Sequence, residues 1–228
     1  MAKIPPGFAI AIDGTMGVGK STVARLLAQM LGITYIDTGA MYRVVALYCL
    51  QNGLTGQAAE IENSLENIGI ELRYVGDTQR VFLNGQDVSE LIRTQEISEI
   101  TSKYVAVNEA VRKKLVAQQQ ELAKTGAVVM DGRDIGSQVL PWAQVKIYLD
   151  ASPQIRARRR TLELESKGQP ANYEMVLEET IQRDERDKTR QISPLVQAPD
   201  AIYIDTGHMT PQEVAEKIKE YVACSTNS

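Results

Sequence analysis

A short stretch near the start of the chain constrains its fold most strongly. An apolar run at residues 8–12 ends in Asp13, the sequence Gly-Thr-Met-Gly-Val-Gly-Lys-Ser-Thr follows at residues 14–22, and a helical pattern continues to Leu31. This is the pattern Gly-x4-Gly-Lys-Ser in the strand–loop–helix context that a phosphate-binding loop requires. An ordinary glycine-rich turn is the structural alternative, and the flanking strand and helix argue against it. The stretch therefore predicts a loop that binds phosphate groups.

Each part of this loop has a chemical reason. Glycines let backbone N–H groups turn inward and approach a phosphate closely. The start of the following helix favours an anion, and Lys20 adds a positive charge for the β- and γ-phosphates. Ser21 is placed to ligate Mg²⁺. These residues predict a site for a triphosphate.

The rest of the chain alternates between apolar runs and helical patterns. The apolar runs lie at residues 8–12, 34–36, 127–130, 145–149 and 201–204. The helical patterns lie at residues 40–52, 57–67, 96–124, 153–167, 173–189 and 211–222. This alternation predicts an α/β fold with a parallel sheet covered on both faces. Ligands bind beyond the carboxyl ends of such strands, where five acids fall: Asp13, Asp37, Asp131, Asp150 and Asp205.

One region breaks the alternation. Residues 70–75 and 80–83 read as strands, and Asn84-Gly85 is a strong hairpin turn before residues 86–88. We expect a small antiparallel insertion here that moves against the core. A hairpin without a role in binding is the alternative.

Composition and charge exclude several other classes of protein. The chain of 228 residues has 43% hydrophobic residues, a net charge of −4 and two cysteines, Cys49 and Cys224. Two cysteines are too few for a disulfide framework and indicate inert thiols in a reducing cytoplasm. The negative charge disfavours a nucleic-acid partner, and neither a membrane span nor a secretion signal is expected. The lone histidine, His208, supports neither a Cys/His metal cluster nor a Ser–His–Asp triad.

The first candidate residues outside the loop follow the second apolar run. Thr38, Tyr42 and Arg43 start the next helical pattern. Arg43 can clamp an anionic group through two hydrogen bonds. Alternatively, Thr38 is a helix cap and Arg43 is a solvated surface charge.

A charged turn follows the third apolar run, with the sequence Asp131-Gly-Arg133-Asp134. One acid can orient metal-bound water or receive a substrate amine, and Arg133 can meet a phosphate. A salt-bridged turn without a ligand is the alternative.

Two further groups of arginines lie on helical patterns. Arg156, Arg159 and Arg160 share one face by spacing, before a predicted mobile flap at Gly168-Gln-Pro170. A basic solvated face is the alternative. The spacing of Arg183, Asp187 and Arg190 also places these three on one face, as a surface ion-pair ladder or as a site for a phosphate and a sugar hydroxyl.

Six stretches of the sequence carry a family resemblance. In order, they are AIDGTMGVGKST, YIDTGAMYRVVAL, LNGQDVSELIRTQEI, MDGRDIG, KIYLDASPQIRARRR and RDERDKTRQISPL. With these motifs the chain resembles the bacterial cytidylate (CMP) kinases, P-loop nucleoside-monophosphate kinases, from Ala9 to about Val222. The resemblance implies a three-layer P-loop NTPase fold with a central five-stranded parallel sheet, an antiparallel-β insertion and a helical lid. It implies one kinase domain at 1–228, with a monophosphate-binding insertion at 69–95 and the lid at 154–170.

The resemblance also implies roles for individual residues. The ATP-binding residues are those of the loop: Gly14, Thr15, Met16, Gly17, Val18, Gly19, Lys20, Ser21 and Thr22. The residues that recognise the cytosine base are Ser102, Arg112 and Asp134. Those that contact the sugar and phosphate of CMP are Thr38, Tyr42, Arg43, Arg133, Arg183, Asp187 and Arg190. The residues that act on the transferred phosphoryl group are Lys20, Arg133, Arg159, Arg160 and Arg190. Ser21 would bind Mg²⁺ together with ATP.

The implied activity is ATP-dependent phosphorylation of CMP, and of dCMP, by a cytoplasmic monomer. Two departures from the family pattern bear on it. The segment that starts at Ser102 is one residue longer than in some relatives, so Thr101 or Lys103 can take the base-contact position. The loop has Thr15-Met16 where Pro and a small residue are common, with little expected consequence. A kinase for UMP, AMP or another small acceptor, or a nucleotide-dependent switch without transfer, is the alternative.

Overall fold

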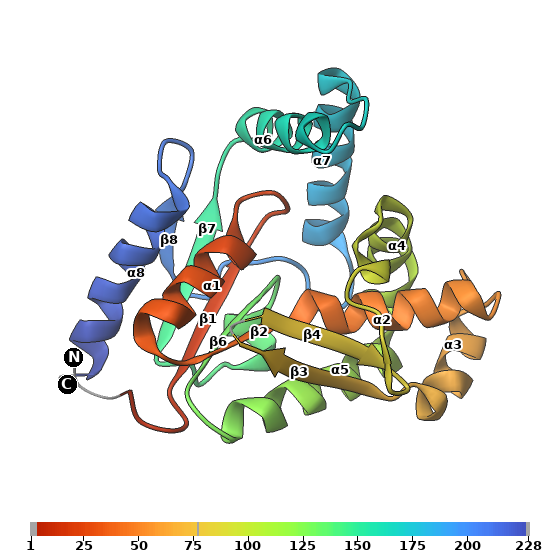
Figure 1. Ribbon diagram of the computed structural model, residues 1–228, viewed down its shortest axis with the longest axis horizontal. Coiled ribbons are helices and arrows are strands. Elements are labelled where there is room, and N and C mark those ends of the chain that lie inside the picture. The colour runs from red at the N-terminus through yellow and green to blue at the C-terminus, as the bar shows by residue number, and fades with distance from the viewer. Residues whose placement is uncertain (1–3, 77, 227–228) are drawn as a thin grey trace. The chain divides into compact units, whose positions relative to one another are not determined.

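The computed structural model describes residues 4–76 and 78–226 and has the expected α/β architecture (Figure 1). The chain divides into two compact units, one from residues 1–35 and 125–228 and the other from residues 36–124. Position 77, within the predicted insertion, lies outside the described residues. No helix in the part of the chain that the structure describes is long and apolar enough to cross a membrane.

The first unit is built on a parallel sheet. Its strands are β1 (Ala9–Gly14), β2 (Thr34–Asp37), β6 (Val128–Gly132), β7 (Val145–Asp150) and β8 (Ile202–Asp205). They form a five-stranded sheet in the order β2-β6-β1-β7-β8, and the boundary between the two units falls within β2. All six residues of β1 are buried, which agrees with its nearly continuous apolar sequence. The predicted five-stranded parallel sheet is confirmed.

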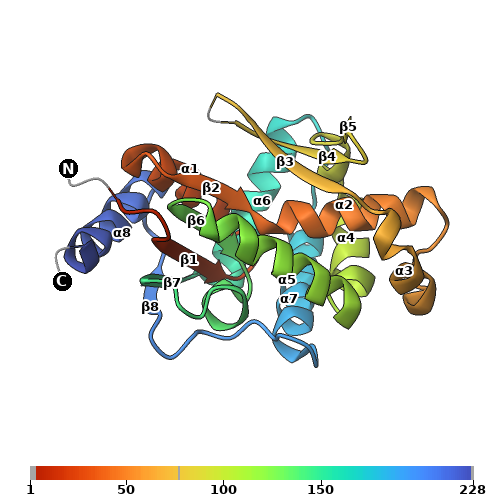
Figure 2. The same ribbon diagram turned by 90° about the horizontal axis from the view of Figure 1, so that it is seen from below.

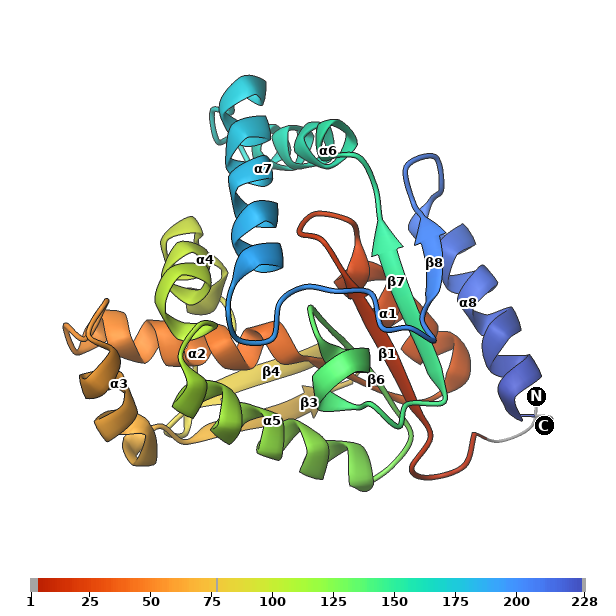
Figure 3. The same cartoon turned by 180° about the vertical axis from the view of Figure 1, so that it is seen from behind.

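Helices complete the first unit. They are α1 (Lys20–Leu31), α6 (Pro153–Ser166), α7 (Tyr173–Thr189), α8 (Pro211–Thr226) and the short π-helical turn η4 (Ile135–Val139). The helices α1 and α8 pack side by side against one face (Figure 2). The segment that leads from α7 to β8 crosses the other face, as does η4 (Figure 3). Apolar side chains of β1, β7, α1 and α8 make up the core.

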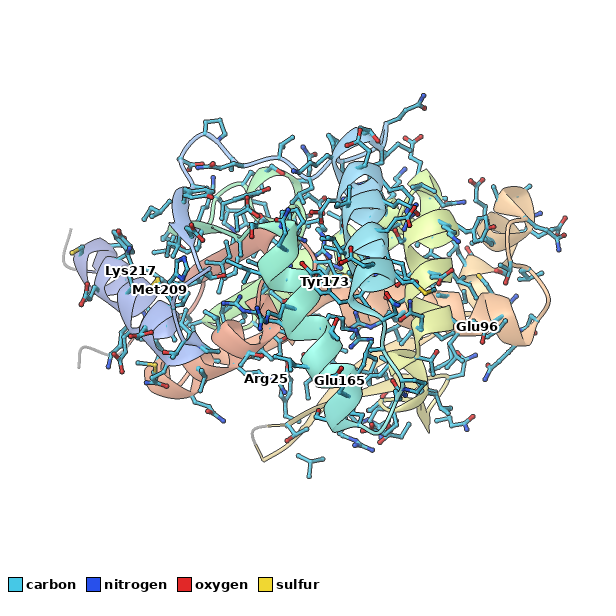
Figure 4. All side chains as sticks on the ribbon, turned by 90° about the horizontal axis from the view of Figure 1, so that it is seen from above. Arg25, Glu96, Glu165, Tyr173, Met209 and Lys217 are labelled. Carbon is cyan, nitrogen blue, oxygen red and sulfur yellow. The ribbon has the colours of Figure 1, made fainter. Side chains whose placement is uncertain are left out.

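Side-chain caps define where two helices with candidate arginines begin. The Ser152 hydroxyl accepts from the Ile155 N–H at the start of α6, and the Asn172 side chain accepts from the Met175 N–H at the start of α7. Figure 4 looks onto both helices, with Glu165 near the end of α6 and Tyr173 in the first turn of α7. Because each cap defines the first residue of its helix, it also defines the position of the arginines along that helix.

The second unit combines helices with a small antiparallel sheet. Its helices and turns are α2 (Thr38–Gln51), α3 (Ala58–Ser64), η1 (Leu65–Asn67), η2 (Leu91–Arg93), α4 (Gln95–Ile100), η3 (Thr101–Val105) and α5 (Glu109–Lys124). Its strands are β3 (Ile70–Val75), β4 (Thr78–Leu83) and β5 (Gln86–Asp87). Asn84 and Gly85 both have positive φ, 49° and 83°, as a two-residue hairpin turn requires. The predicted hairpin is confirmed.

The prediction of one continuous helix over residues 96–124 is wrong. The chain forms α4, then the π-helical turn η3, and begins α5 only at Glu109. Asn108 lies at the break, where its Oδ1 accepts from the Val111 N–H and its Nδ2 donates to Glu62. A side chain that caps a new helix competes with continuation of the preceding one, and the apolar spacing alone does not reveal this.

Candidate functional site

The phosphate loop adopts a conformation that its sequence requires. Gly14 has φ +149°, and a Cβ atom there would lie 2.0 Å from the Leu149 carbonyl oxygen on β7. Gly19 has φ 97° and immediately precedes α1. A side chain at Gly14 would clash with β7, and a side chain at Gly19 would strain the backbone. The loop can therefore adopt this conformation only with glycine at both positions. The sequence pattern predicted this strand–loop–helix unit correctly.

Lys20 lies buried beneath the loop. Its Nζ donates to the carbonyl oxygens of Gly14 at 2.9 Å and Thr15 at 2.6 Å. Burial lowers the pKa of the Lys20 ammonium well below its usual value, and the charge of Arg133 acts in the same direction. The charge of Asp131 opposes this shift. An added anion would favour the charged ammonium, which suits a phosphate-binding lysine.

Ser21 and Asp131 meet at the ends of neighbouring elements. The Ser21 Oγ donates to Asp131 Oδ2 at 2.7 Å, and the Tyr35 hydroxyl donates to Asp131 Oδ1 at 2.9 Å. A hydroxyl and a carboxylate oxygen are the hard ligands that Mg²⁺ prefers. Sequence reasoning left the role of Asp131 open; its position at the end of a strand beside β1 is the signal that pairs it with Ser21.

The charged turn after β6 joins the end of α7. Arg133 Nε donates to Asp187 Oδ2 at 2.7 Å, and Arg190 Nη2 lies 3.7 Å from Asp134 Oδ1. Burial alone would raise the pKa of Asp187, but the charge and hydrogen bond of Arg133 oppose this. Together with the charges of Arg183 and Arg190, these two effects of Arg133 lower the pKa of the Asp187 carboxyl. The structure thus brings together five predicted residues as one cluster, the β6–α7 cluster: Arg133, Asp134, Arg183, Asp187 and Arg190.

The three arginines of α6 do not share one environment. Arg156 is buried and paired with Asp184, so it does not belong to a solvated basic face. Arg159 donates to the Thr206 carbonyl oxygen at 2.7 Å, and Arg160 makes a more exposed pair with Glu163. Sequence reasoning missed Asp184, because its partner lies 28 residues earlier in the chain.

The second unit holds the remaining candidates, and the first of them lie on α2. The Asp37 side chain accepts from the Ala40 N–H and is therefore the cap of α2, in place of Thr38. Arg43 Nη2 pairs with Asp37 at 2.9 Å. The Arg112 guanidinium lies over the ring of Tyr42, 5.6 Å from its centre, which is cation–π geometry.

The structure distinguishes the three candidates for the base contact. The Thr101 hydroxyl donates to the Ile97 carbonyl oxygen at 2.6 Å, and the Lys103 ammonium is exposed beside Glu99. Ser102 is buried, and its Oγ has no hydrogen-bond partner among the described residues. A buried hydroxyl in this state is suited to a ligand, so the geometry favours Ser102.

Fold and site together define the class. A parallel sheet, a glycine loop with a buried lysine, and a hydroxyl–carboxylate pair at the strand ends define an α/β protein of the P-loop class. The sequence model of the Cytidylate kinase family matches residues 10–224. The chain belongs to this family.

Individual proteins agree with this assignment. A cytidylate kinase of Fervidobacterium nodosum is 47% identical over 213 residues, which cover 93% of this chain and 95% of that protein. One of Carboxydothermus hydrogenoformans is 49% identical over 214 residues, covering 93% and 96%. Among solved structures, a gluconokinase of Sinorhizobium meliloti aligns with a TM-score of 0.50 at 12% identity, covering 98% of this chain and 97% of that one. That likeness concerns the fold alone.

Proposed function

We propose that this chain transfers the γ-phosphoryl group of ATP to CMP, and to dCMP, giving ADP and CDP or dCDP. The β6–α7 cluster carries the proposal: a cationic and acidic group of side chains in the same unit as a phosphate loop, in a chain of the cytidylate kinase family. The family membership does not favour the alternatives, a kinase for UMP or AMP or a switch without transfer.

The donor nucleotide is assigned to the loop. Its N–H groups and the Lys20 ammonium would hold the ATP phosphates, because a helix start and a buried ammonium that donates to the loop carbonyl oxygens both favour an anion at this loop. This assignment covers the nine residues named above, from Gly14 to Thr22.

Mg²⁺ fits the oxygen ligands beside the loop. Ser21 Oγ and Asp131 Oδ2 are 2.7 Å apart, and Mg²⁺ in kinases is held by one or two such groups together with substrate phosphates. No group of three or more His, Cys, Asp or Glu that could hold a metal occurs among the described residues. Bound there, Mg²⁺ would neutralise charge on the phosphate oxygens.

The acceptor nucleotide is assigned to the residues that the family resemblance implies, each by its chemistry. Arg133, Arg190 and Arg43 would hold the CMP phosphate through paired N–H donors. Asp187 would accept from a sugar hydroxyl. The remaining sugar and phosphate contacts are assigned to Thr38, Tyr42 and Arg183.

Recognition of the base is assigned to three residues. Asp134, Arg112 and Ser102 would match the donors and acceptors of the cytosine edge. The buried Ser102 hydroxyl supports its part in this, since a ligand would supply the hydrogen-bond partner that it lacks among the described residues.

Phosphoryl transfer asks a protein mainly to align the reactants and neutralise charge. No general base is needed, because a monophosphate oxygen is already anionic. Residues 154–170 would act as a lid that excludes water, with Arg159 and Arg160 approaching the transferred group. Residues 69–95 would be the monophosphate-binding insertion of a single kinase domain. We also propose a cytoplasmic monomer, which sedimentation at assay concentration would test.

A coupled kinase assay tests the function. With ATP and Mg²⁺, turnover should be fastest with CMP and dCMP and much slower with UMP and AMP. Equal turnover of all four would overturn the base assignment. ATP hydrolysis without transfer to any monophosphate would instead support the switch.

A further inference from the structure

Asp13, at the end of β1, is a buried carboxylate for which the proposed reaction has no use. It lies directly before the phosphate loop, yet its contacts are with the charged turn after β6. Oδ1 accepts from the Ile135 N–H at 2.8 Å and Oδ2 from the Gly136 N–H at 2.7 Å. Each oxygen of this one side chain thus holds one backbone N–H group of the turn.

These two N–H groups need an acceptor. They belong to the first residues of η4, where the helical pattern supplies no carbonyl partner, whereas the N–H groups of Gln138 and Val139 donate to the Asp134 carbonyl oxygen. At a pH above its pKa, the Asp13 carboxyl is ionised and accepts stronger hydrogen bonds than a neutral group would. Asp13 therefore fixes the backbone immediately after Arg133 and Asp134.

Placing a carboxylate here costs stability. Burial raises the pKa of Asp13 to about 7, although the N–H groups of Gly136 and Ile135 act to lower it. The neighbouring Asp134 raises the pKa further, and Lys20 lowers it. The Lys20 ammonium donates to loop carbonyl oxygens. The hydrogen bonds that Asp13 accepts come from the N–H groups of the turn.

We propose that Asp13 is a positioning residue, whose carboxylate holds the turn at residues 133–136 so that Arg133 and Asp134 face the acceptor nucleotide. This rests on the proposed function, since it assigns those two residues to CMP. Asp13 directly precedes the phosphate loop. Nevertheless, its replacement should weaken binding of the acceptor nucleotide, CMP, more than binding of the donor nucleotide, ATP.

The test is Asp13→Asn, with KM measured separately for CMP and ATP. An asparagine can accept from only one of the two N–H groups and turns an N–H donor toward the other. We expect KM for CMP to rise roughly tenfold, as for loss of a hydrogen bond to a charged group, with KM for ATP nearly unchanged. The control is Asp205→Asn, which removes another carboxylate at a strand end whose oxygen accepts from the Gly207 N–H. It should leave both KM values unchanged.

A second variant disturbs the same contact from the other side. A Cβ atom at Gly136 would lie 3.4 Å from Asp13 Oδ2 and 3.2 Å from Lys146 Cδ, so Gly136→Ala should shift the turn by a few tenths of an ångström. A selective rise in KM for CMP is expected here too. This variant decides the question if Asp13→Asn does not fold.

Three outcomes would overturn the proposal: wild-type KM values, equal rises in both KM values, or a fall in kcat alone. Amide hydrogen exchange separates its failure from failure of the proposed function. Exchange at Ile135 and Gly136 should become faster in Asp13→Asn even without substrate, and unchanged exchange would refute the positioning contact itself. A wild-type protein that does not phosphorylate CMP would refute the function instead.

Discussion

Arg156 on α6 and Asp184 on α7 form a buried ion pair in which two guanidinium nitrogens donate to both carboxylate oxygens. Arg156 Nη1 also donates to the Met16 carbonyl oxygen at 3.0 Å, at the tip of the phosphate loop. One side chain therefore ties α6, α7 and the phosphate loop to each other.

Breaking this pair should strongly destabilise the protein. Asp184→Ala would leave a buried guanidinium without its charge partner, and we expect the free energy of unfolding to fall by about 3–5 kcal/mol. Urea denaturation followed by circular dichroism measures this. The matched control is Glu163→Ala, which removes the more exposed partner of Arg160 and should cost less than about 1 kcal/mol. Similar losses in the two variants would contradict the structural role of Arg156.

Lys20→Ala should remove transfer and preserve the fold. The ammonium lies under the loop and is the group assigned to the ATP phosphates. Loss of one preorganised donor to developing charge lowers kcat by about 10²–10³ or more. The coupled assay measures this, with circular dichroism as the check on folding. Lys124→Ala, at an exposed lysine beside Glu121, should keep wild-type turnover. Wild-type turnover in Lys20→Ala would contradict the loop assignment.

Much of the fold was predictable because its signals are local. The apolar run of β1, the glycines that flank the loop and the Asn84-Gly85 turn each act within a few residues. The carboxyl-edge rule then placed Asp131 and its neighbours at one end of the sheet. Helical spacing also placed Arg183 and Asp187 on one face of α7, whereas Arg190 lies just beyond the end of the helix, where spacing alone does not place it.

The parts that escaped prediction depend on partners distant in sequence. Nothing in the spacing of the α6 arginines tells which one is buried, because Asp184 decides it. The break at Asn108 likewise depends on α3, where the Asn108 amide donates to Glu62. The partners of the two residues considered beside Ser102 were also not visible in the sequence: the Thr101 hydroxyl donates to the Ile97 carbonyl oxygen, and Lys103 pairs with Glu99.

Arg190→Met should impair use of CMP and spare ATP. Arg190 lies just after α7, where its Nε donates to the Ser193 carbonyl oxygen and its Nη2 approaches Asp134. Loss of a charge-assisted contact to phosphate predicts a rise of roughly 10–100-fold in KM for CMP. Steady-state kinetics with each nucleotide varied in turn measures this. Arg158→Met, at an exposed arginine of α6, is the control and should match wild type. A selective loss of ATP affinity would mean that donor and acceptor sites are reversed.

Asp13 should give the stability of the protein a specific pH dependence. Burial raises its pKa from 3.8 to about 7 in the folded state, so between these values the folded chain holds a proton that the unfolded chain has released. The slope of unfolding free energy with pH follows the difference in bound protons, and is therefore negative for this group. Its contribution is fully present below pH 3.8 and is lost as pH rises through about 7. The ceiling is on the order of 4 kcal/mol, from the size of the shift.

Comparison with Asp13→Asn isolates this group, because asparagine does not titrate. Urea denaturation of both proteins at a series of pH values gives the difference in unfolding free energy, wild type minus variant. That difference should decrease steadily as the pH rises from about 4 to about 7, because in this range the folded wild type keeps a proton on Asp13 that its unfolded chain has released, whereas asparagine binds none in either state. Asp205→Asn, at an exposed strand end, should give a difference from wild type without this decrease. A flat difference for Asp13→Asn, or one that increases with pH, would show that the carboxyl is ionised throughout and that the turn fully compensates for its burial.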